Sequence, residues 1–104
     1  MKGMERRKRV QERYTCFLDV VLDNSLSCKA YDISEGGIYV RTDTVLKTGS
    51  IVSVRLSSGS LELDLKARVK HGVEGIGMGL MFIDLDTALK SQIRAFLEEI
   101  KKSS

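Results

Sequence analysis

The sequence predicts an all-β protein that ends in an α-helix, with six short strands forming a small antiparallel barrel or sandwich. Three observations lead to this fold class. Apolar and polar residues alternate in short stretches separated by turn sequences. The pattern changes to helical spacing near the end of the chain. The length, 104 residues, is that of one domain. A closed arrangement is favoured because closure removes exposed strand edges.

The strands are predicted from β-branched and aromatic residues that lie between turn sequences. They are YTCFLDVVL (14–22), LSCKAYDI (26–33), GIYVRT (37–42), IVSVRL (51–56), LELDLKARVK (61–70) and IGMGLMFI (76–83). The fifth strand is the most regular, since an apolar residue stands at every second position and charged residues stand between them. The residues expected to face one way are Leu61, Leu63, Leu65, Ala67 and Val69.

The turns are predicted where Gly, Asn, Asp and Ser gather. DNS, SSGS and HGVEG interrupt the alternation, and the last of these places His71 in a turn. Gly77 and Gly79, inside the sixth strand, are expected to mark a sharp bend or a close approach.

After residue 84 the apolar residues recur at spacings of three and four, which is typical of one face of a helix. This face consists of Leu89, Ile93, Phe96, Leu97 and Ile100. Asp84 or Asp86 can cap the helix start by accepting a backbone N–H bond. The helix is expected over about residues 86–101, as the last element of a barrel unit that covers residues 14–104.

The positive charge of the chain is concentrated in residues 1–13, which we call the N-terminal arm. The arm has six cations against two acids, a net charge of +4, in a chain whose total is +3; the other 91 residues therefore carry −1. Because it has almost no apolar residues, the arm is expected to be flexible when the protein is alone. Such a basic segment indicates an anionic partner.

The composition argues against an enzyme, a metal protein and a membrane protein. His71 is the only histidine, and a solvated turn residue is the simpler interpretation than a general base. Asp84 and Asp86 are better explained as helix caps than as metal ligands. Cys16 and Cys28 lack a CxxC spacing and are expected to be reduced, packed thiols. No apolar run approaches the roughly 20 residues that span a bilayer, and no secretory signal is recognisable, so we expect a cytoplasmic protein without a cofactor.

DISEGG, residues 32–37, interrupts the sheet between the second and third predicted strands. The structural interpretation is a turn in which Asp32 and Ser34 bond local backbone and Gly37 takes a positive φ. The functional interpretation is that Asp32 accepts from the N–H groups of a guanine edge and Ser34 adds a polar contact. Glycine would then let the ligand approach the backbone.

The arm contains RVQER, in which Arg9 and Arg13 have the spacing R-x-x-x-R, with Lys8 directly before them. Arginine grips phosphate with a planar fork, and the same fork fits O6 and N7 of guanine. The alternative is a solubilising tail or a nonspecific polyanion patch.

The two stretches together resemble the PilZ domain family. The family pattern is R-x-x-x-R, a spacer, and then [D/N]-x-S-x-x-G. In this chain it falls on Arg9 and Arg13 and then, nineteen residues later, on Asp32, Ser34 and Gly37. GIGMGLMF, residues 75–82, is similar to the family's last strand, of the type G-x-G-x-x-F. The resemblance covers about residues 5–100.

The resemblance implies a six-stranded antiparallel barrel of the split-barrel type that binds the bacterial second messenger cyclic di-GMP and has no catalytic activity. It implies that Arg9 and Arg13 hold phosphate and the guanine Hoogsteen edge. Asp32 and Ser34 would read a guanine from the barrel, with Gly36 and Gly37 making room for it. Lys8 adds charge that could favour a stacked pair of ligand molecules, which is a hypothesis.

The same resemblance implies that the output passes to an unidentified protein partner, in motility, surface polysaccharide or biofilm control. Some relatives place an aromatic ring near the ligand; Tyr14, Tyr31 or Tyr39 could serve here. Two alternatives remain open at this point. The first is an adaptor of the same fold that binds a protein without the nucleotide. The second is a small barrel that binds RNA or DNA through the arm, which the low aromatic content and the net −1 of the barrel disfavour.

Overall fold

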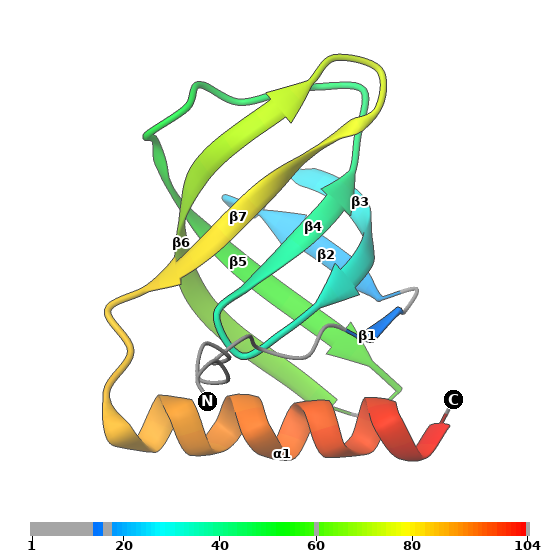
Figure 1. Cartoon of the computed structure of the whole chain (residues 1–104), viewed down its shortest axis with the longest axis vertical. Helices are drawn as coiled ribbons and strands as arrows, with labels where there is room; N and C mark the ends of the chain where they lie inside the picture. The colour runs from blue at the N-terminus through cyan, green and yellow to red at the C-terminus, as the bar shows by residue number, and fades with distance from the viewer. Residues whose placement is uncertain (1–13, 16–17, 60, 104) are drawn as a thin grey trace, which may run out of the picture.

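The chain folds into a closed antiparallel β-barrel followed by one helix, as the computed structural model in Figure 1 shows. The structure describes residues 14–15, 18–59 and 61–103. Within them the elements are β1 (Tyr14–Thr15), β2 (Asp19–Leu22), β3 (Leu26–Ile33), β4 (Gly37–Arg41), β5 (Ile51–Ser58), β6 (Leu61–Val73), β7 (Gly77–Ile83) and α1 (Thr87–Ser103). The predicted fold class is confirmed.

The barrel closes because β3 pairs with strands on both of its sides. Neighbouring strands follow the order β3-β2-β5-β6-β7-β4, and the β3–β4 ladder joins the two ends. β2 pairs with the beginning of β3, whereas β1 pairs with its end and places Thr15 opposite Asp32. The strand expected over residues 14–22 is therefore present as two strands that lie on the same side of β3, and six strands make the circumference.

The interior is filled by the alternating apolar residues. In β6, Leu63, Leu65, Ala67 and Val69 are buried and the charged residues between them are exposed. Leu61, which was expected to share their environment, is 37% exposed because it is the first residue of the strand. The strict alternation of this segment therefore predicts its buried face well, except at the strand end.

The β2–β3 hairpin has the turn that its sequence predicts. Asp23 and Asn24 have φ values of 51° and 58°, and the N–H of Ser25 donates to the carbonyl of Leu22 at 3.0 Å. Asp and Asn visit this left-handed region more readily than other non-glycine residues. Two such residues in succession match the right-handed twist of a hairpin.

The turn predicted at HGVEG begins later than expected. β6 continues to Val73, and the chain reverses at residues 74–76, where Gly75 has a φ of 81°. The placement of His71 in a turn is therefore wrong: it is an exposed strand residue paired with Gly79. Gly75 supplies the left-handed conformation of this turn, and residues 71–73 before it continue the pairing with β7.

Helix α1 lies across one end of the barrel (Figure 1). Its predicted apolar face packs on the core, since Ile93, Phe96, Leu97 and Ile100 are buried and Leu89 is partly buried against the same cluster. The helix thus closes the end of the barrel that strand pairing alone would leave open.

Asp86 caps this helix. Its Oδ1 accepts a hydrogen bond from the N–H of Leu89 at 2.8 Å, which satisfies one of the donors left over at a helix start. Asp84, the other candidate cap, has a φ of 56° and lies in the link from β7. Among the described residues, no helix combines the length and the apolar character needed to cross a membrane.

Candidate functional site

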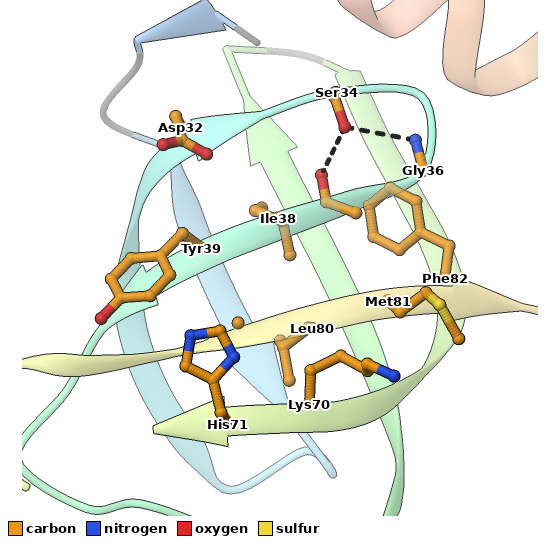
Figure 2. Close-up of a pocket in the computed structure, with 12 residues that line it drawn as sticks. Asp32, Ser34, Gly36, Ile38, Tyr39, Lys70, His71, Leu80, Met81 and Phe82 are labelled. Atoms are coloured by element: carbon orange, nitrogen blue, oxygen red, sulfur yellow. Dashed lines mark hydrogen bonds between the residues drawn. The ribbon is translucent and has the colours of Figure 1, made fainter. Parts of the chain in front are cut away.

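The DISEGG segment forms the connection from β3 to β4. The N–H of Ser34 donates to the carbonyl of Gly37 at 2.9 Å. The hydroxyl of Ser34 accepts from the N–H of Gly36 at 3.3 Å and lies 3.5 Å from the carbonyl oxygen of Gly37, as Figure 2 shows. Ser34 is 1% exposed, so its side chain holds the turn together from the inside.

Gly37 is required by the packing of β4 on β7, and the positive φ expected of it is not observed. A Cβ at this position would lie 2.4 Å from the carbonyl oxygen of Leu80, a distance that no side chain tolerates. The carbonyl of Gly36 accepts from the N–H of Phe82 at 2.9 Å. These contacts fix the DISEGG segment to β7, and the glycine is needed for close approach and not for turn geometry.

A hollow of about 600 Å³ lies on the outer face of the barrel above β4 and β7. We call it the outer hollow. Four predicted site residues line it together, namely Asp32, Ser34, Gly36 and Gly37. Tyr39 from β4 and Lys70 and His71 from β6 contribute the other polar groups (Figure 2). The structure therefore brings the whole DISEGG segment, except the buried Ile33 and the exposed Glu35, to one concave surface.

Two bulges aim side chains into the outer hollow. The pairing of β3 with β4 shifts between Ala30 and Asp32, and the pairing of β6 with β7 shifts between Val69 and His71. A bulge lets two successive side chains point to the same face of a sheet. Ala30 and Val69 are buried in the barrel, so strict alternation would also point Asp32 and His71 inward. The bulges instead turn Asp32 and His71 to the outer face.

At the outer hollow, residues that pair across four neighbouring strands form a row. Asp32 is opposite Tyr39, Tyr39 is opposite Gly79, and Gly79 is opposite His71. The row combines a carboxylate acceptor and two flat rings, with a position between the rings that has no side chain. Lys70, next to His71, adds a cation at the edge of the outer hollow. Such a set of groups suits a polar ligand with flat rings and negative charge.

An ion pair links the DISEGG segment to the helix. Glu35 Oε1 lies 3.6 Å from Nε of Arg94 in α1, and both side chains are at least half exposed. Exposed pairs of this kind contribute about 0–1 kcal/mol, so the backbone bonds described above, and not this pair, hold the segment.

Cys28 has no part in the outer hollow. It is a partly buried thiol in β3 without a disulfide partner among the described residues, and burial raises its pKa to about 11. It therefore remains protonated at neutral pH, as the sequence predicts for a packed thiol. In the described part of the chain, no three His, Cys, Asp or Glu side chains gather as a metal site would need.

The remaining predicted site residues, Lys8, Arg9 and Arg13, lie outside the described residues, as does Cys16. The sequence analysis did not select Lys70, His71 or Gly79 as site residues. The sequence does contain a signal for Lys70 and His71, because these two successive polar residues end the strict alternation of β6. The position of Gly79 between two rings depends on pairing with β4 and β6 and leaves no local signal.

The closed barrel and its outer hollow, lined by an acceptor, a cation and two rings, are the features by which this chain can be compared with known domains. The chain belongs to the PilZ domain family, which matches residues 5–99. PilZ domains are non-catalytic receptors and adaptors, and the family is one of cyclic di-GMP receptors.

Solved structures share this fold at low sequence identity. The inhibitor of motility MotI/DgrA of Bacillus subtilis superimposes with a TM-score of 0.72 and 19% identity over 96% of this chain, which spans about half (51%) of that protein. The PilZ domain of CeSA from a cellulose-synthesizing bacterium gives 0.71 and 22% identity, over 86% of this chain and 98% of that one. Borreliella burgdorferi PlzA in complex with c-di-GMP gives 0.56 and 14%, over 86% and 41%. Among curated protein sequences, none matches this chain significantly.

Proposed function

We propose that this protein is a receptor for cyclic di-GMP that binds the nucleotide between its N-terminal arm and the outer hollow. One observation carries the proposal: Asp32, Ser34, Gly36 and Gly37, which the family pattern selects from the sequence, line a single hollow on the outer face of the barrel. The solved PlzA structure, which shares the fold, contains c-di-GMP.

The topology supports a role for the arm at the same place. Tyr14 pairs with Ile33 and Thr15 with Asp32, so the residues that directly follow the arm in the sequence lie beside the DISEGG segment. Arg9 and Arg13 are proposed to grip phosphate and the guanine Hoogsteen edge, because guanidinium groups form paired, charge-assisted bonds with both. Lys8 is proposed to add charge for the phosphates.

Four residues of the DISEGG segment have proposed roles. Asp32, partly exposed at the rim of the outer hollow, accepts from the N–H groups of a guanine edge. Ser34 acts mainly through the turn, since its hydroxyl is buried against Gly36 and Gly37. Gly36 and Gly37 have no side chains and so leave room for the base in the outer hollow.

Binding is proposed to order residues 8–13 across the barrel face while the barrel itself moves little. Ordering costs roughly 1–2 kcal/mol per backbone residue, so the net affinity should be moderate. NMR relaxation of the amides of residues 8–13, with and without saturating cyclic di-GMP, tests this step; equal mobility in both states would contradict it.

The output is proposed to pass to a protein partner in control of motility or biofilm formation. The Bacillus subtilis relative of the same fold is an inhibitor of motility, which makes motility the first process to test. A ligand-independent adaptor is the alternative, and it predicts partner binding without any response to cyclic di-GMP.

Calorimetric titration with cyclic di-GMP, with cyclic di-AMP and GTP as controls, tests the proposed function. Cyclic di-AMP has the same charge but an amino group in place of O6, so selectivity for cyclic di-GMP reports base recognition. Arg9→Ala should weaken binding about 10- to 150-fold, since charge-assisted bonds contribute roughly 1.5–3 kcal/mol each.

Arg6→Ala is the matched control, because it removes the same charge from the arm outside the R-x-x-x-R spacing. It should bind nearly as the parent does. Equal losses for the two variants would indicate a nonspecific polyanion patch, and steep salt dependence with oligonucleotides would favour the nucleic-acid alternative. A parent protein that binds none of the nucleotides would favour the adaptor.

A further inference from the structure

Gly79 stands between two rings in the outer hollow. A Cβ added to it would lie 3.7 Å from Cε1 of His71 and 3.8 Å from Cδ1 of Tyr39. Both distances are ordinary van der Waals contacts, so the position above Gly79 is open and the two rings flank it. Figure 2 shows Tyr39 and His71 on the outer surface, one from β4 and the other from β6.

The packing of the barrel does not require glycine at this position. At Gly37 and Gly77 a Cβ would lie 2.4 Å and 2.2 Å from a carbonyl oxygen of the neighbouring strand. Gly79 has no contact of that kind, and its φ is not positive. The close approach predicted from the sequence is therefore confirmed for Gly77 and wrong for Gly79. Glycine weakens a strand relative to residues with side chains, so its presence at position 79 calls for a reason other than packing.

The ring of Tyr39 is held in place from its other side. Its centroid lies 6.1 Å from that of Tyr31, with the planes tilted by 53°. The guanidinium of Arg41 lies 5.8 Å from the centroid of Tyr31. Tyr39 also extends over β7, where its Cε2 would be 3.0 Å from a Cβ at Gly77. A ring positioned in this way loses little freedom when a ligand stacks on it.

We propose that the open position above Gly79, which the rings of Tyr39 and His71 flank, is a stacking subsite for a guanine base of cyclic di-GMP. The inference rests on the proposed function. Stacking on flat side chains accepts any base, whereas the edge contacts of Asp32 and the arm arginines read guanine. The subsite thus adds affinity, and the neighbouring residues add selectivity. Lys70, next to His71 in β6, also lines the outer hollow, and its side chain extends toward Met81 (Figure 2), where its charge can attract the phosphates.

Gly79→Ala is the sharpest test, because the added methyl fits the free protein and fills the floor of the gap. Its melting temperature should equal or exceed that of the parent, and its affinity for cyclic di-GMP should fall about 10-fold or more. Tyr39→Leu and His71→Leu should each lower affinity by about 5- to 100-fold, since stacking on one base supports losses of that size. Tyr39→Phe keeps the ring and should bind as the parent does.

A direct readout is available because His71 is the only histidine in the chain. Its Hε1 resonance should move upfield when cyclic di-GMP is added, as expected for a proton above the face of a base, and should not move in Gly79→Ala. If the parent binds cyclic di-GMP while Gly79→Ala binds equally well and the His71 resonance stays in place, the subsite is overturned and the proposed function stands. A parent that does not bind cyclic di-GMP overturns both.

Discussion

The two sides of this barrel differ in the regularity of their strand pairing. The β5–β6 ladder pairs without interruption from Ile51 opposite Arg68 to Ser58 opposite Leu61. The ladders on the other side, β3–β4 and β6–β7, each contain a register shift. The regular side buries every second residue of both strands, and its outer surface carries alternating charges with an ion pair between Arg55 and Asp64 at 2.9 Å.

The irregular side carries three glycines in β4 and β7 where the regular ladder has side chains. Two of them, Gly37 and Gly77, let adjacent backbones approach. The third, Gly79, leaves a gap. The comparison indicates that the regular ladder serves the core, and that the proposed binding surface lies where pairing is interrupted by bulges and by positions without side chains. Four substitutions test this division.

The largest effect on stability is expected on the regular side. Leu56 is fully buried in β5, and Leu56→Ala should lower the free energy of unfolding by about 2–5 kcal/mol through lost burial and a cavity. Urea denaturation measures this loss. The affinity of the remaining folded protein for cyclic di-GMP should be unchanged; a parallel loss of affinity would show that the two sides are not independent.

Gly77→Ala should lower the free energy of unfolding by about 1–3 kcal/mol or more, because the new Cβ would collide with the carbonyl of Val40. Gly79→Ala is the matched control in the same strand and should be neutral or stabilising by up to about 1 kcal/mol. Thermal unfolding of the two variants compares them directly. Similar losses in both would contradict the distinction between a glycine required by packing and one that is not.

Ser34→Ala removes a buried hydroxyl that bonds within the DISEGG segment. We expect a loss of about 1 kcal/mol in stability and a smaller loss of affinity than Arg9→Ala causes, because the hydroxyl shapes the turn. Ser27→Ala, at an exposed position of β3, is the control and should change stability by less than about 0.5 kcal/mol. An affinity loss for Ser34→Ala without any loss of stability would instead indicate direct contact with the ligand.

The smallest effect is expected from the exposed ion pair on the regular side. Nε of Arg55 donates a hydrogen bond to Oδ1 of Asp64, and this bond together with the carboxylate charge raises the pKa of Arg55, but both side chains are exposed. Asp64→Ala should therefore lower the free energy of unfolding only slightly at low salt, and not measurably in 1 M salt. A loss that persists in high salt would mean that Asp64 contributes by packing.

Local patterns alone determined much of this fold. The alternation in residues 61–70, the Asp23–Asn24 turn and the helical spacing from Leu89 to Ile100 each depend on residues close in sequence. These predictions are correct to within a few residues, and Asp86 was one of the two caps proposed. The Asp32, Ser34 and Gly37 pattern was likewise selected from the sequence, while the role of Arg9 and Arg13 stays a prediction.

Only the tertiary structure decided how these parts face one another. The bulges at Asp32 and His71, the division of residues 14–22 into β1 and β2, and the meeting of Tyr39 with His71 across Gly79 depend on the register of strands far apart in the chain. The sequence also left Tyr14, Tyr31 and Tyr39 as equal candidates, and the β3–β4 register places Tyr39 opposite Asp32 at the outer hollow. Register is set by the sum of many cross-strand contacts and by barrel closure. No single stretch of sequence contains those contacts, so a gap between two rings exists only once the barrel has closed.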